Sequence, residues 1–181
     1  MGSQYYLVSQ LPALENYEGR GQLPLTEKSF KELCSRFLSK KDCKILEKLS
    51  LEAPKSDAKT GSALLDKWNE KERNLRFALA QIRALKMKKE SEMIAGSISA
   101  DVMQAARTAV GMDSPLAAEE YLNQYRMETL KNLTPLDNFS VDAVFAYGLK
   151  LMLAERMKLF DAEIGKDSYH KIYDEILGDA K

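Results

Sequence analysis

A long segment free of proline and glycine constrains the fold of this chain more than any other feature. It runs from Ser62 to Ala95, and within it Trp68, Leu75 and Ile82 recur every seven residues. The apolar residues near the companion positions of this heptad seam are Leu64, Ala78 and Leu85. The spacing predicts one long helix with an apolar seam, with a length of roughly 40 to 50 Å at the helical rise per residue.

Two charged residues interrupt the seam. Lys71 and Glu72 lie within it, and a free coiled coil does not favour charge at such positions. We therefore expect the seam to pack against an antiparallel helix of the same chain. The carboxylate pairs Glu70/Glu72 and Glu119/Glu120 stand beside basic residues at helical spacing, which is typical of solvated helix faces.

Capping residues predict two helices before the long one. Thr26 is a suitable N-cap for the first, and Ser39 followed by Asp42 predicts the start of the second. A polar linker over 51–61 then leads to the long helix.

Further helices follow the long one. Ser97 or Ser99 precedes a shorter helix that ends near Gly111. Ser114 with Pro115 predicts another helix through about residue 132, because proline suits the first helical position. A final long helix begins after Ser140, and Gly165 would bend or divide it.

These elements predict an all-α helical bundle with two long helices and several shorter ones, in a single domain over 1–181. Its parts are an N-terminal arm and two-helix unit over 1–50, the linker over 51–61 and a long-helix bundle over 62–181. Residues 5–11 are rich in β-favouring side chains but end at Pro12, so a short strand and an extended arm both remain open there.

Composition argues against several classes of partner and location. Lys plus Arg and Asp plus Glu both number 27, so the chain has no overall basic field for nucleic acid. The most apolar segment, from Val141 to Leu153, contains Asp142 and Lys150 and does not read as a membrane span. The start of the chain lacks a signal-peptide pattern. We expect a cytoplasmic protein that reaches a membrane only through a partner.

No motif for catalysis, cofactor binding or metal binding is present. His170 is the only histidine, and neither Glu-x-x-His nor His-Glu-x-x-His spacing surrounds it. Cys34 and Cys43 lack Cys-x-x-Cys spacing, so we interpret them as reduced thiols. We therefore expect a non-enzymatic protein with no catalytic, cofactor-binding or metal-binding residues. An enzyme whose site is dispersed along the sequence stays an alternative.

Two features of the long helix are candidates for recognition, a basic cluster at its end and an asparagine beside its seam. Arg83, Lys86, Lys88 and Lys89 form a basic cluster where cations offset the negative end of the helix dipole. Because no aromatic residues are interleaved with these cations, we interpret the cluster as a helix terminus or as the rim of a binding site for an acidic protein, in preference to a nucleic-acid site. Asn74 lies next to the seam, and a buried Asn there would set the register of a helix pair, so structural and partner-specifying roles are both open.

Three segments resemble a known family. They are Tyr5 to Pro12, Glu72-x-Asn74-Leu75-Arg76 and Ile82-Arg83-Ala84-Leu85-Lys86. The sequence resembles an uncharacterised bacterial family encoded among the subunits of V-type ATPases. That family is in turn similar to the C subunit of A/V-type enzymes, which is named the d subunit in eukaryotes. The C subunit is a longer protein, so this chain would correspond to part of that subunit.

The resemblance implies a non-catalytic subunit of a bacterial V-type ATPase. Such a subunit couples or assembles the central stalk with the membrane proteolipid ring during ion transport, and its partners are the other ATPase subunits. It would lie in the cytoplasm, peripheral to the inner membrane through the complex. The positions that match the family pattern and would bind partners or set register are Asn74, Arg76 and Arg83, with Tyr5 and Tyr6 anchoring the N-terminal arm.

A helical adaptor for protein–protein interaction, unrelated to an ATPase, would show the same sequence features. Replacing Arg76 and Arg83 together by Glu is expected to weaken partner binding and to leave the helix content intact.

Overall fold

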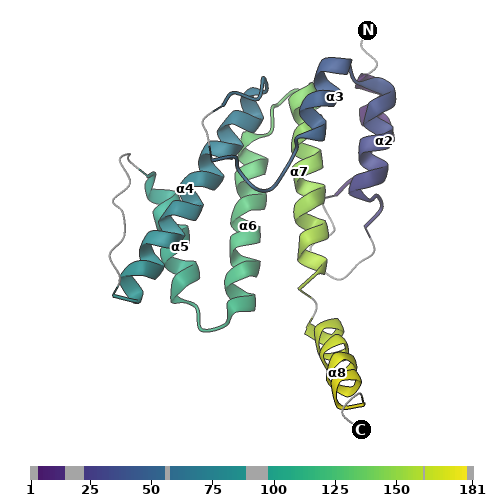
Figure 1. The fold of residues 1–181 in the computed structure, drawn as a ribbon. Helices are drawn as coiled ribbons and strands as arrows, with labels where there is room; N and C mark the ends of the chain where they lie inside the picture. Colours follow the sequence, from purple (N-terminus) through teal and green to yellow (C-terminus); the bar gives the residue numbers. More distant parts are fainter. Residues whose placement is uncertain (1–3, 15–22, 56–57, 89–97, 161, 179–181) are drawn as a thin grey trace.

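Helices account for all regular structure wherever the chain is described. The computed structural model describes residues 4–14, 23–55, 58–88, 98–160 and 162–178. Within these ranges there are eight helices and no strand, which confirms the all-α prediction (Figure 1). The helices are α1 (Gln4–Gln10), α2 (Glu27–Phe37), α3 (Lys40–Glu47), α4 (Ala63–Lys86), α5 (Ala100–Gly111), α6 (Pro115–Leu133), α7 (Val141–Lys158) and α8 (Ala162–Gly178).

Hydroxyl side chains determine where most of these helices begin. The Thr26 hydroxyl accepts a hydrogen bond from the backbone N–H of Ser29 in α2, and Ser114 accepts one from Ala117 in α6. The same arrangement recurs at Ser39, Ser62 and Ser140. Each cap satisfies a backbone donor that the helix leaves free and contributes about 1 kcal/mol. The predicted starts at Thr26, Ser39, Ser114 and Ser140 are therefore confirmed.

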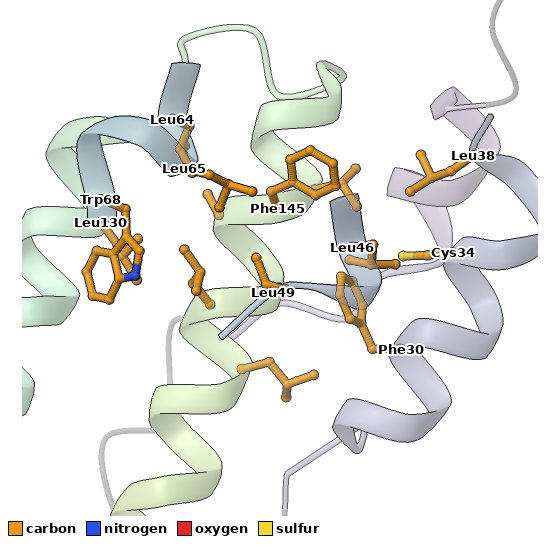
Figure 2. Packing of buried hydrophobic residues seen from close by; sticks show 14 of the residues in the cluster. Phe30, Cys34, Leu38, Leu46, Leu49, Leu64, Leu65, Trp68, Leu130 and Phe145 are labelled. Atoms are coloured by element: carbon orange, nitrogen blue, oxygen red, sulfur yellow. The ribbon is translucent and has the colours of Figure 1, made fainter. Parts of the chain in front are cut away.

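The first of two apolar clusters is built around α7. Phe30 on α2, Trp68 on α4 and Phe145 on α7 are each only 1% exposed within it. Figure 2 shows Phe30 and Leu46 on one side of α7 and Trp68 with Leu130 on its other side. Because neighbours cover α7 on both sides, its sequence is apolar almost all around, as expected for a buried helix.

The second cluster lies between α4, α5 and α6. Leu75 and Ala78 from the second half of α4 pack with Val102 and Ala106 of α5 and with Leu122 of α6. The first half of α4 supplies Trp68 to the first cluster, so this one helix belongs to both. The heptad residues Trp68 and Leu75 are both buried, as the seam predicted.

Two helices, α5 and α6, pack on the seam, and α6 runs antiparallel to α4. Residue numbers fall along α6 as they rise along α4: Glu72 pairs with Arg126, and Leu75 shares a cluster with Leu122. Helix α6 meets the expectation of an antiparallel partner within the chain, but the more extensive packing on α4 comes from α5, which is not antiparallel.

Helix α5 runs parallel to α4. The Lys71 ammonium lies 2.9 Å from an Asp101 carboxylate oxygen near the start of α5, and the Lys86 ammonium donates to the Val110 carbonyl at its end. Lys86 therefore contributes to a helix terminus, as the basic cluster suggested, whereas Lys89 lies outside the described residues.

The N-terminal extended segment was predicted incorrectly. Residues 4–10 form α1, in which Leu7 is fully buried and Val8 and Leu11 pack against the same first cluster. These three positions share one side of a helix, so burial in the cluster outweighs the β propensity of the segment. No strand lies within the described ranges to pair with an extended arm.

Two helix boundaries also differ from expectation. Helix α4 has 24 residues and ends at Lys86, so it is about 36 Å long, shorter than predicted. Leu85, expected in the seam, is 65% exposed at this end, where α5 also ends. The last long helical segment divides after Lys158, and Gly165 lies inside α8 instead of at the break.

Candidate interaction surface

Helix α8 carries an apolar face that its own chain does not cover. Tyr169, Ile172, Tyr173 and Ile176 are spaced by three and four residues and therefore share one side of the helix. Their exposed fractions lie between 49% and 65%. We call these four residues the α8 apolar face. Figure 1 shows α8 beyond the end of α7, apart from the other helices.

The rest of α8 is equally open to solvent. Every side chain from 165 to 177 is exposed, and the rings of Tyr169 and Tyr173 stack on each other, with centroids 6.0 Å apart. Isolated helices of this length are marginal in water, because packing of an apolar face supplies most helix stability in proteins. An amphipathic helix without a covering neighbour is therefore an expected docking element.

The charges of α8 favour a protein partner over an anionic lipid surface. Between 165 and 177 the helix carries two lysines and three carboxylates, so its formal charge there is −1. Helices that lie in membrane interfaces are typically rich in Lys and Arg on the polar face. No helix in the described ranges is long and apolar enough to span a membrane.

His170 lies on this helix, and its side chain is exposed. Its ring meets Tyr169 edge to face at a centroid distance of 5.7 Å. No cluster of three His, Cys, Asp or Glu side chains that could hold a metal occurs in the described residues.

The two predicted N-terminal contact residues lie on α1. Tyr5 is 52% exposed and stacks on Phe139, which precedes α7, with ring centroids 4.6 Å apart. Tyr6 is 70% exposed. Tyr5 thus makes an intramolecular contact, and Tyr6 remains open at the surface.

The other three predicted residues lie along α4 and differ in environment. Asn74 is half-buried, and Arg83 is exposed. Arg76 is partly exposed, but its guanidinium donates to Glu72 Oε1 at 3.0 Å and to the Leu51 carbonyl at 3.4 Å. Arg76 therefore ties α4 to the segment that follows α3.

The five predicted residues do not form one site. Ser62 at the start of α4 donates to Asp142 at the start of α7, so this end of α4 lies near the position of Phe139 and Tyr5. Arg76 lies about 20 Å further along α4, and Arg83 about 30 Å. Their roles in partner binding stay predictions for separate parts of the surface.

A buried ion pair between α4 and α6 was not foreseen. Arg126 Nε lies 2.9 Å from Glu72 Oε2, and Arg126 Nη2 lies 3.0 Å from Glu72 Oε1. The side chains are 8% and 2% exposed, so the solvated face expected for Glu72 is wrong. The position of Glu72 within the apolar seam could have indicated that its side chain would be buried. The sequence did not identify Arg126 as its partner, because Arg126 lies far along the chain on another helix.

A second polar contact joins three helices at the surface. Asp101 on α5 accepts from Lys71 on α4 at 2.9 Å and from the Tyr125 hydroxyl on α6 at 3.0 Å. Hydrogen bonds from Ser99 and from Lys71 hold the pKa of Asp101 well below its usual range. Burial of the Tyr125 side chain and its hydrogen bond to Asp101 raise the pKa of the Tyr125 hydroxyl to about 12.

Both thiols are free, as expected. Cys34 is fully buried in the first cluster, and burial raises its pKa to about 12, which disfavours the reactive thiolate. Cys43 is half-buried.

Comparison with known proteins gives one family match. Residues 108–179 match a family described as a protein of unknown function (DUF2764). The match covers less than half of the chain, from within α5 to the end of α8, and does not include the segments 5–12 and 72–86 that resemble the ATPase-associated family. No curated protein and no solved structure matches the chain.

The family match includes all of α8. The sequence already showed the spacing of Tyr169, Ile172, Tyr173 and Ile176, but spacing alone cannot tell whether another helix of the chain covers such a face. That information comes from the exposure of the side chains along the helix.

Proposed function

We propose that this protein is a non-catalytic subunit of a bacterial V-type ATPase that binds another subunit through the α8 apolar face. In this role it couples or assembles the central stalk with the proteolipid ring. The observation that supports binding is the exposure of every side chain from 165 to 177 on an amphipathic helix of 17 residues. The choice of an ATPase rests on the sequence resemblance of residues 5–12 and 72–86.

The α8 apolar face is large enough to contribute to a stable contact. Tyr169 and Tyr173 are large, rigid side chains with two rotatable bonds, a type enriched at interface hot spots. At roughly 25 cal/mol per Å² of covered apolar surface, burial of the four side chains would contribute several kcal/mol before the cost of association. A partner that offers an apolar groove or a second helix would supply the missing cover.

The helices that precede α8 suit a rigid unit that resists mechanical deformation. Helices α4 and α6 are joined by the buried pair of Glu72 with Arg126, and α6 and α7 are joined by Glu119 with Arg156 at 3.0 Å. A protein that seats a rotating stalk has to resist deformation, and closely packed helices connected by such pairs meet that need. This role requires no side-chain chemistry.

Co-purification tests the proposal. The tagged chain is isolated from gently solubilised membranes of its native cell, and the captured proteins are identified by mass spectrometry. We expect stalk and proteolipid subunits with the wild type. The variant Ile172→Glu with Ile176→Glu should lose them, because two charges would enter the contact.

A matched control changes the opposite side of the same helix. Lys171→Gln with Glu175→Gln alters two exposed residues outside the α8 apolar face and should retain the same partners. If both variants capture the wild-type set, α8 is not the contact. If the wild type captures only proteins unrelated to an ATPase through α8, the protein is a helical adaptor instead.

A further inference from the structure

A cavity lined with lysines lies between α3, the segment that follows it and the beginning of α4. Its volume is about 480 Å³. Lys41, Lys44 and Lys48 are spaced by three and four residues, so they share one side of α3 and its C-cap. Lys59 contributes a fourth ammonium group from the segment before α4.

The described lining carries an excess of positive charge in a chain that is neutral overall. Against the four lysines stands one carboxylate, that of Glu52, so the formal charge of the lining is +3. The Lys59 ammonium, on a side chain that is 84% exposed, lies 3.9 Å from an Asp66 carboxylate oxygen, which is a loose pair. Among the residues that the structure describes, Lys41, Lys44 and Lys48 form no ion pair.

These lysines are exposed, and their arrangement favours the binding of an anion. Like charges three and four residues apart on a helix repel each other, and together they raise the local potential that attracts a counter-ion. Leu49 and Leu65, which are buried, line the same cavity.

We propose that this cavity binds a small polyanion that carries two or more phosphate or carboxylate groups. The volume lies in the range of pockets for small molecules. Lysine ammonium groups are compact charges that bind phosphate and carboxylate without the fixed fork of arginine. No aromatic side chain lines the described cavity, so it offers no stacking surface for a base, and a compact aliphatic or inorganic anion fits best. This site is distinct from the α8 apolar face and does not depend on the ATPase proposal.

Calorimetric titration of the full chain tests the site with two probes, inorganic pyrophosphate and citrate, at constant ionic strength. Saturable binding of pyrophosphate assigns the site to phosphates, and saturable binding of citrate assigns it to carboxylates. The variant Lys44→Gln with Lys48→Gln should weaken binding about tenfold or more, because two charged donors are lost. Glutamine is a good helix former, so α3 should persist, and circular dichroism checks this.

The matched control is Lys28→Gln with Lys131→Gln. Both lysines are exposed, on α2 and α6, and neither lines the cavity. This variant has the same net charge as the cavity variant and should bind as the wild type does. The site is ruled out if neither probe binds the wild type saturably, or if the two variants lose affinity equally.

Discussion

The Arg126 guanidinium on α6 holds the Glu72 carboxylate on α4 by two hydrogen bonds of 2.9 and 3.0 Å, in the interior between the helices. Arg76, one turn further along α4, adds a third bond to the same carboxylate from the side nearer solvent. A planar guanidinium and a carboxylate match only in a narrow range of positions, so this contact fixes the register of α4 against α6.

Removing one partner of this pair should strongly lower the stability of the protein. Glu72→Gln or Glu72→Ala leaves the Arg126 charge buried without its counter-ion, and each is expected to lower the free energy of unfolding by about 3 to 5 kcal/mol. The double variant Glu72→Met with Arg126→Leu removes both charges and should lose less than either single variant. Urea unfolding followed by circular dichroism measures these values. Additive losses in the double variant would show that the two side chains do not act as a pair.

The helix starts could be predicted because their cause is local. A hydroxyl at Thr26, Ser39, Ser114 or Ser140 needs only the backbone N–H three residues ahead, and both groups are visible in the sequence. The seam at Trp68 and Leu75 was visible for a similar reason, since its periodicity lies within one helix.

The features that were missed depend on distant parts of the chain. The β-favouring residues around Leu7 form a helix because α2 and α7 supply the cluster that covers one side of it. Glu72 looked like a solvated residue because Arg126, its partner, lies on another helix. The α8 apolar face could not be recognised as a surface without the arrangement of the other helices.

The pH dependence of stability should show the contact between Asp101, Lys71 and Tyr125. The pKa of Asp101 is lower in the folded state than in the unfolded chain, so its contribution is present above about pH 4 and is lost as the pH falls through the folded value. Asp101→Asn should therefore reduce the difference between urea midpoints measured at pH 7 and pH 3. Asp113→Asn controls for the change in net charge. An unchanged difference in Asp101→Asn would contradict the assignment.

Gly148 on α7 lies where Phe30 of α2 and Leu49, which follows α3, pack closely against α7. A Cβ at this position would lie 2.7 Å from both Leu49 Cδ2 and Phe30 Cε1, closer than real contacts allow. Gly148→Leu should therefore destabilise the protein by at least about 1 to 3 kcal/mol through overpacking. Gly165→Ala in α8 meets no atom within 4 Å and should instead raise helix content, by up to about 1 kcal/mol in propensity. Thermal unfolding and circular dichroism compare the two, and a Gly148→Leu protein of wild-type stability would refute the packing argument.

The charge reversals at Arg76 and Arg83 should behave differently, although the sequence suggested treating them together. Arg76→Glu places a carboxylate beside the buried Glu72 and removes the contact with the Leu51 carbonyl, so a loss of about 1 to 3 kcal/mol is expected. Arg83→Glu changes an exposed residue and should stay within about 0.5 kcal/mol of the wild type. Urea unfolding of the two single variants measures this contrast. Arg83→Glu alone is then the variant that tests partner binding at the end of α4, because a binding defect in Arg76→Glu could follow from the weakened fold. Equal stability of the two variants would mean that Arg76 makes no net contribution through Glu72, and the paired substitution would again be a clean test of the surface.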